Sequence, residues 1–296
     1  MKSGKHYSRR QFITRTAAGM AVGLSAGSFR EALASHAAFS SRLTTLAETE
    51  RIREYQDHML LDSKIAYLNT GSLGPSVKEI IDLVHAKMIE LEQNPVSNMW
   101  GPVGDEAENV RCRAARFFNT SKDEIIMTRN TTEGMNIIAD GLSLKPGDEV
   151  LITDEEHPGG RICWNHKAKY EGIGLRRADL PRPAQSPEEI LSRIENRISP
   201  KTRVFSFSQV TTATGLQLPV KEIAAMMKKR GIITVCDGAQ VPGMIPVDIQ
   251  ELGVDVYALS AEFRKRVLRL VKRRREAFAA AAVDLDALLA AEAQRD

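Results

Sequence analysis

Short apolar runs alternate with amphipathic stretches along most of this chain. Strands are predicted at residues 124–128, 149–153, 173–178, 203–207, 232–236 and 255–259. Helices are predicted between them, near residues 132–141, 159–171, 187–197 and 219–230. This alternation predicts an α/β fold with a mainly parallel sheet that helices cover on both faces. Ligands of such sheets bind at the carboxyl ends of the strands, so polar residues that directly follow strands are the first functional candidates.

The residues before this alternation have a different pattern. Residues 41–60 are polar and predict an arm or a helix, and residues 65–76 predict a short strand and a Gly-rich turn. A helix is predicted over residues 77–92, because its apolar residues recur at helical spacing: Val77, Ile80, Ile81, Val84, Met88 and Leu91. A further helix is predicted over residues 104–118.

Four loops after predicted strands carry polar residues with more than one interpretation. Thr131 and Thr132 precede an apolar helix, where they suit either a phosphate site or an ordinary N-cap. His157 suits stacking on a flat ring or a surface turn. The loop 208–219 is rich in hydroxyls and suits a ligand or a plain turn. Asp237 ends an apolar strand, where a carboxylate is costly unless it is paired, or it belongs to a turn.

In their order along the chain, these loops resemble the class V aminotransferase family of pyridoxal-phosphate (PLP) enzymes, which includes cysteine desulfurases and isopenicillin-N-epimerase-like proteins. The segments YLNTGSLGP (67–75) and NPVSNMWG (94–101) resemble the opening motifs of the epimerase-like branch. The resemblance covers about residues 60–260. It implies the large domain of a PLP-dependent transferase with a sheet of the seven-stranded type, a homodimer in the intact family form, and chemistry at the α-carbon of an amino-acid substrate.

The same resemblance implies roles for individual residues in binding the cofactor. Thr131, Thr132 and Ser260 would bind its phosphate. His157 would stack on the pyridine ring, and Asp237 would keep the ring nitrogen protonated. PLP accepts electrons well only while that nitrogen holds a proton, and a nearby buried carboxylate raises its pKa.

Three further residues gain roles from the resemblance. Thr212 and Gln240 would approach the ring hydroxyl of the cofactor, and Asn69 would contact the substrate.

Gln209 departs from the family pattern, because desulfurases have a histidine at that place. None of the three cysteines, Cys112, Cys163 and Cys236, matches the desulfurase nucleophile, and their sparse spacing predicts neither a disulfide framework nor a metal cluster.

The main departure lies at the end of the last predicted strand. Members of the family have Ser-x-His-Lys there, with the Schiff-base lysine last, whereas this chain has Ser260-Ala261-Glu262-Phe263. Phe263 takes the place of the lysine, and Lys265 follows two residues later, so no catalytic residue is assigned. We therefore expect a truncated, catalytically impaired member of the family that binds PLP weakly or noncovalently. The alternatives are a non-catalytic module that binds PLP or an amino acid, and a basic-tailed interaction protein.

Charge is distributed unevenly, although the formal net charge is only +3. Residues 264–275 contain eight Lys or Arg, and an Ala-rich tail that is predicted to be helical follows. A basic amphipathic helix suits nucleic acid or an anionic membrane. The abrupt end of the resemblance favours a shifted reading frame instead, and nucleic acid is not an expected partner.

The N-terminus resembles a twin-arginine signal peptide. Arg9 and Arg10 precede a weakly apolar stretch at residues 17–27, and a small-residue cleavage pattern follows at 32–34. A basic N-terminus before a short helix is the alternative. We expect a periplasmic or exported protein without a membrane span. The expected domains are a signal peptide, an N-terminal arm, a partial transferase large domain and a helical tail: 1–34, 35–76, 77–262 and 263–296.

Overall fold

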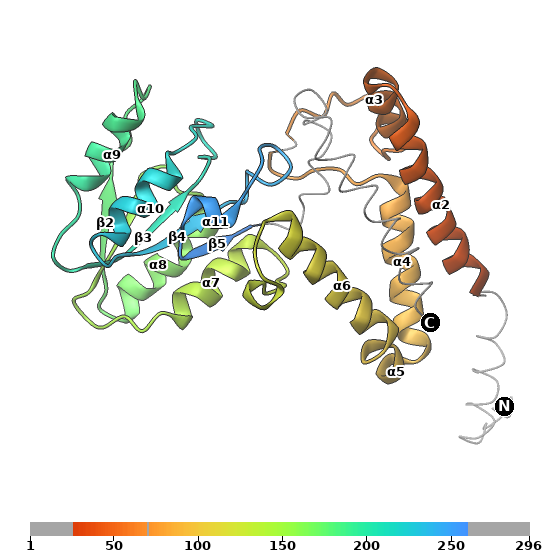
Figure 1. Ribbon diagram of the computed structural model, residues 1–296, viewed down its shortest axis with the longest axis horizontal. Helices are drawn as coiled ribbons and strands as arrows, with labels where there is room; N and C mark the ends of the chain where they lie inside the picture. Colours follow the sequence, from red (N-terminus) through yellow and green to blue (C-terminus); the bar gives the residue numbers. More distant parts are fainter. Residues whose placement is uncertain (1–25, 70, 260–296) are drawn as a thin grey trace, which may run out of the picture. The chain divides into compact units, whose positions relative to one another are not determined.

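The computed structural model describes residues 26–69 and 71–259 (Figure 1). The predictions for Arg9, Arg10, Ser260 and the basic run fall outside the described residues. Within this part, the chain divides into two compact units, one with residues 26–60 and 76–105 and the other with residues 61–69, 71–75 and 106–259. None of the helices in these ranges has the length and apolar character needed to cross a membrane.

The first unit is helical. Its elements are α2 (Ala26–Thr45), α3 (Glu48–Asp57), α4 (Lys78–Gln93), α5 (Pro95–Met99) and the start of α6 (Pro102–Phe117). Helices α2 and α4 contact each other, and Phe39, Leu43 and Val77 form the apolar cluster of this unit. The helix predicted over residues 77–92 is confirmed as α4, but Val84 and Met88 on its apolar stripe are 55% and 63% exposed.

The second unit contains the sheet. Its helical elements are the end of α6, η1 (Lys122–Glu124), α7 (Thr131–Gly141), α8 (Pro158–Tyr170), α9 (Pro187–Glu195), α10 (Val220–Lys228) and α11 (Ile249–Leu252). Its strands are β1 (Glu149–Thr153), β2 (Gly174–Ala178), β3 (Thr202–Ser208), β4 (Ile233–Asp237) and β5 (Val256–Ala258). In the described part of the chain, the five strands are all parallel and lie in the order β2-β1-β3-β4-β5. The predicted α/β fold with a parallel sheet is confirmed.

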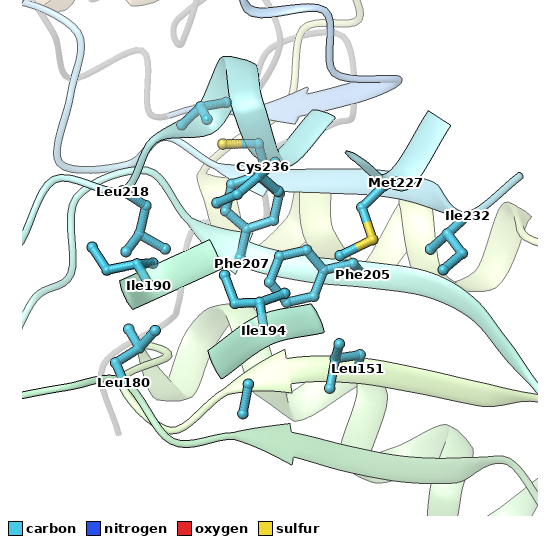
Figure 2. Packing of buried hydrophobic residues seen from close by; sticks show 13 residues of the cluster. Leu151, Leu180, Ile190, Ile194, Phe205, Phe207, Leu218, Met227, Ile232 and Cys236 are labelled. Atoms are coloured by element: carbon cyan, nitrogen blue, oxygen red, sulfur yellow. The ribbon is translucent and has the colours of Figure 1, made fainter. Parts of the chain in front are cut away.

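Alternate residues of each strand face opposite sides of the sheet, as the two-residue period of a strand requires. On one face, Leu151, Phe205 and Phe207 pack with apolar residues of α9 and α10 (Figure 2). On the other face, Val150 and Ile152 pack with residues of α7 and α8. The sheet is therefore buried on both faces, and the loops at its strand ends are where polar groups of a site can gather.

Two strand predictions are wrong. Residues 124–128 form the end of η1 and an irregular segment, and Ile126 is 76% exposed. In the described ranges no strand pairs with this segment, and a β-prone sequence becomes a strand only when a neighbour completes its hydrogen bonds. Residues 65–69 and 71–76 also contain no strand, although a single antiparallel bridge joins Met59 and Val77.

Candidate cofactor-binding site

His157, Asp237 and Gln240 lie at or after the ends of strands of the second unit, whereas Thr131 and Thr132 follow the irregular segment after η1. The parallel register places Ser208, at the end of β3, opposite Asp237, at the end of β4. The carboxyl ends of parallel strands lie at one edge of the sheet, so the loops that follow these strands meet there. The first turn of α8 and the first turn of α7 complete this region.

Asp237 provides a buried carboxyl group at this edge. The residue is 6% exposed, and its Oδ1 accepts a hydrogen bond from the backbone N–H of Ala239 at 2.9 Å. Burial raises the pKa of Asp237, while that backbone hydrogen bond and the neighbouring His157 lower it. No Lys, Arg or His among the described residues forms an ion pair with Asp237. A buried carboxylate without a cation is costly, so this position is suited to a cationic ligand group.

Two glycines let the first turn of α8 pass close to the predicted site residues. His157 is the N-cap of α8, and its Nδ1 accepts a hydrogen bond from the backbone N–H of Gly159 at 3.0 Å. A Cβ at Gly159 would collide with Thr132 Oγ1, and a Cβ at Gly160 would lie 2.6 Å from Asp237 Oδ2. The structure therefore brings Thr132, His157 and Asp237 together around this turn.

The start of α7 carries an unpartnered hydroxyl. Asn130 is its N-cap, and Asn130 Oδ1 accepts a hydrogen bond from the backbone N–H of Glu133 at 2.8 Å. Thr131 is 9% exposed, and its Oγ1 is buried without a hydrogen-bond partner among the described residues. Asn130 is the N-cap of α7, so neither Thr131 nor Thr132 has the capping role that the sequence left open. A hydroxyl beside the backbone N–H groups at the start of a helix is suited to hydrogen-bonding an anion.

The remaining predicted residues lie in loops. Gln240 Nε2 donates a hydrogen bond to the carbonyl of Gly71 at 3.2 Å, which brings the turn that contains Asn69 to the end of β4. Asn69 is exposed, and its Oδ1 accepts a hydrogen bond from Ser72 Oγ at 2.9 Å. Thr212 is exposed in the loop after β3. Ser260 lies outside the described residues.

The sequence interpretation missed two buried glutamates in the loop between β1 and α8. Glu156 accepts hydrogen bonds from the hydroxyls of Thr153 and of Ser208, the latter at 2.7 Å. Burial raises the pKa of Glu156 to about 7, and the neighbouring Asp237 adds to this rise. The only signal in the sequence is an acidic pair directly after an apolar strand, which a surface turn would also show.

The second missed glutamate, Glu155, joins two loops of the site. Its carboxylate accepts hydrogen bonds from Arg182 Nε at 2.6 Å and from the hydroxyl of Thr214. Burial raises the pKa of Glu155, but the hydrogen bonds from Thr214 and Arg182 bring it below the usual value. Glu155 thus ties the loop of His157 to the loop that contains Thr212.

Gln209, which departs from the family pattern, has a side-chain hydrogen-bond partner in the structure. Gln209 is 3% exposed, and its Oε1 accepts a hydrogen bond from Tyr257 Oη at 2.6 Å. The ring of Tyr257 occupies the place that a Cβ at Gly238 would take. Gln209 and Tyr257 therefore form one packed unit beside the strand end of Asp237.

Three observations fit these residues to PLP. Among the described residues, the buried carboxyl of Asp237 has no ion pair and the hydroxyl of Thr131 has no hydrogen-bond partner, and Gly159 and Gly160 let the first turn of α8 lie close to Thr132 and Asp237. The cofactor has a ring nitrogen that can carry a proton and a phosphate that accepts hydrogen bonds, so it matches both groups. The described residues contain no group of three or more His, Cys, Asp or Glu side chains that could hold a metal ion.

Comparison with known proteins points in the same direction. The family model of aminotransferase class-V matches residues 69–262. The isopenicillin N epimerase of Streptomyces clavuligerus is 33% identical over 205 residues, which make up 69% of this chain and 52% of the epimerase. A probable cysteine desulfurase of Halalkalibacterium halodurans is 30% identical over 220 residues, or 72% of this chain and 53% of the relative. The chain thus spans about half the length of these curated relatives.

Solved structures show the same likeness. The cystine C–S lyase C-DES, in complex with its reaction product cysteine persulfide, is 29% identical with a TM-score of 0.59, over 67% of this chain and 53% of that chain. A lysine-to-alanine variant of C-DES, with glycine covalently linked to the PLP cofactor, is 28% identical with a TM-score of 0.58, over 67% of this chain and 52% of that chain.

Proposed function

The chain belongs to the class V aminotransferase family of PLP-dependent enzymes, and from this premise we propose that it binds PLP noncovalently and turns over amino acids weakly or not at all. The first part of the proposal rests on the residues around the first turn of α8. The second part rests on Phe263, which takes the place of the family's lysine.

One observation carries the proposal for PLP binding. Asp237 is 6% exposed and has no ion pair in the described part of the chain, and burial raises its pKa. A protonated ring nitrogen beside this carboxyl would supply the missing cation and favour the ionised form of Asp237. The site residues and the ligand therefore stabilise each other's charge.

Each of the other residues has a chemical role towards the same ligand. PLP, when bound, supplies an electron sink for reactions at the α-carbon of an amino acid. Thr131 and Thr132 would bind the phosphate, which would give the buried Thr131 hydroxyl its partner. His157 would cover one face of the ring and exclude water from it. Gln240 and Thr212 would approach the ring hydroxyl, and Asn69 would contact the amino-acid substrate.

The proposal of impaired turnover follows from the loss of one amine. A lysine at that position both attaches the cofactor and moves a proton at the α-carbon, and the side chain of Phe263 has no group that can do either. A general acid–base group contributes roughly 10²–10⁴-fold to rate. A lysine-to-alanine variant of the similar protein C-DES holds PLP with glycine covalently linked to it.

A titration of the full-length chain with PLP tests the proposal. We expect saturable binding, detected by the absorbance of the cofactor, and no racemisation or release of sulfide above background from L- or D-amino acids. Asp237→Asn should weaken binding by about tenfold or more, because it removes the charge that pairs with the ring nitrogen. Asp179→Asn is the matched control, since Asp179 is exposed just after β2. Equal affinities for these two variants would contradict the proposal.

Two properties of the whole protein complete the proposal. The twin-arginine motif at Arg9 and Arg10 supports export to the periplasm with the cofactor already bound. The exposed apolar residues of α4, Val84 and Met88, support a homodimer, since apolar surface of this kind is commonly covered by a partner. Cell fractionation tests the first property, and sedimentation velocity of the purified chain tests the second.

A further inference from the structure

Two hydroxyl groups, one at the end of β1 and one at the end of β3, donate hydrogen bonds to the carboxyl group of Glu156. Thr153, the last residue of β1, and Ser208, the last residue of β3, both donate hydrogen bonds to its carboxyl group. Only 9% of Glu156 is exposed. The next residue in the chain is His157, the N-cap of α8, and the strand partner of Ser208 is Asp237.

We propose that Glu156 is a positioning residue for the cofactor site, because its carboxyl fixes the loop that carries His157 against the ends of β1 and β3, and β3 pairs with the strand of Asp237. The proposal rests on the proposed function, since it assigns a role towards the same ligand. Glu156 itself need not touch the ligand. It acts through the position of His157 and through the charge of Asp237.

The surroundings of Glu156 favour its uncharged form. Among the described residues, the titratable groups that interact with it are Asp237 and Cys236 on β4, and His157 follows it in the chain. From β1 it meets the hydroxyl of Thr153, and from β3 it meets the hydroxyl and the backbone of Ser208. Burial raises its pKa to about 7, and the neighbouring Asp237 contributes to the rise while the hydroxyls oppose it. Near neutral pH a large fraction of Glu156 is therefore protonated.

The uncharged form has a consequence for the ligand. Two ionised carboxylates side by side in a buried site repel each other, so one of them binds a proton. If Glu156 holds that proton, Asp237 is free to carry the single negative charge that a protonated ring nitrogen needs. A side chain at position 156 that keeps the hydrogen bonds without a charge should therefore preserve the site.

Two variants distinguish a positioning role of the Glu156 side chain from a role in which it only fills space. Glu156→Gln keeps the shape and the hydrogen-bonding capacity of the protonated acid, and Glu156→Met keeps the volume without either hydrogen bond. In the full-length chain, we expect Glu156→Gln to bind PLP within about twofold of wild type, and Glu156→Met to bind about tenfold more weakly. Equal binding by all three proteins, or equal losses in both variants, would overturn the proposal. Ser208→Ala removes one of the two hydrogen bonds to Glu156 and should give an intermediate loss of PLP affinity. This variant tests the proposal if Glu156→Met does not fold.

A second measurement needs no cofactor, so it separates this inference from the proposed function. Folded Glu156 holds its proton up to about pH 7, whereas the unfolded chain releases it near pH 4.3. Between about pH 5 and pH 7 the wild-type unfolding constant should therefore rise about tenfold per pH unit relative to that of Glu156→Gln. Denaturant titrations at several pH values measure this ratio. A ratio that stays constant with pH would show that Glu156 is ionised in the folded chain and would overturn the inference, whether or not PLP binds.

Discussion

Gly160 lies so close to Asp237 that a Cβ at position 160 would be 2.6 Å from the Oδ2 of Asp237. Carbon and oxygen atoms do not approach this closely without a shift of one of them. The glycine at this position therefore allows the first turn of α8 to lie beside the buried carboxyl at the end of β4. The relationship links a helix start to the proposed ring-nitrogen partner.

Substituting this glycine should move the carboxyl of Asp237. We expect Gly160→Ala to weaken PLP binding by about tenfold and to lower the free energy of unfolding by about 1–3 kcal/mol, since an added methyl group overpacks a buried site. Gly141→Ala, at the end of α7, is the control, because its Cβ would meet no atom within 4 Å. Binding titrations and urea unfolding measure both effects. Unchanged PLP affinity in Gly160→Ala would show that Asp237 does not contact the ligand.

The unpartnered hydroxyl of Thr131 leads to a prediction with opposite signs for stability and binding. Thr131→Val keeps the shape of the side chain and removes a buried hydroxyl without a partner. We expect the free energy of unfolding without ligand to stay the same or to rise by about 1 kcal/mol, and PLP or inorganic phosphate to bind several-fold more weakly.

A second buried threonine provides the contrast. Thr234 is 1% exposed, and its hydroxyl donates to Asp255 at 2.7 Å. Thr234→Val should lower the free energy of unfolding by about 1–3 kcal/mol, because Asp255 loses that donor. If Thr131→Val destabilises the chain as much as Thr234→Val does, the Thr131 hydroxyl has a structural partner and the assignment to phosphate loses its support.

The sequence predicted most of the sheet because the buried strands of a parallel sheet are rich in apolar residues. Residues 149–153 and 232–236 were placed within one residue of β1 and β4. Residues 124–128 were as apolar but are not a strand. A strand depends on a neighbour to pair with, and no local pattern tells whether that neighbour is present.

The candidate site was only partly predictable for a related reason. Asp237 was found because a carboxylate that ends an apolar run is unusual. Glu155 and Glu156 were missed because two acids in a turn are ordinary at a surface, and only the folded chain shows that both are less than 10% exposed. Two of their hydroxyl partners, Ser208 of Glu156 and Thr214 of Glu155, are 52 and 59 residues away in the sequence, so these pairings arise from the strand order.

The proposed twin-arginine signal at the N-terminus gives a prediction that is independent of the cofactor. Replacing Arg9 and Arg10 by Lys should keep the precursor in the cytoplasm, because the twin-arginine pathway reads that pair. Arg15→Lys is the matched control and should leave export unchanged. Immunoblots of periplasmic and cytoplasmic fractions measure the outcome. Periplasmic protein from the double variant would contradict the assignment of this segment.

The central claim is that this chain holds PLP without a covalent bond to a lysine, and borohydride reduction followed by peptide mass spectrometry tests it most directly. Borohydride converts any imine between PLP and an amine into a stable pyridoxyl group. We expect saturable PLP binding with either no pyridoxyl label or sparse labelling scattered over surface lysines. Stoichiometric labelling of Lys265, which lies two residues beyond Phe263, would contradict the claim, because it would show that a shifted lysine attaches the cofactor.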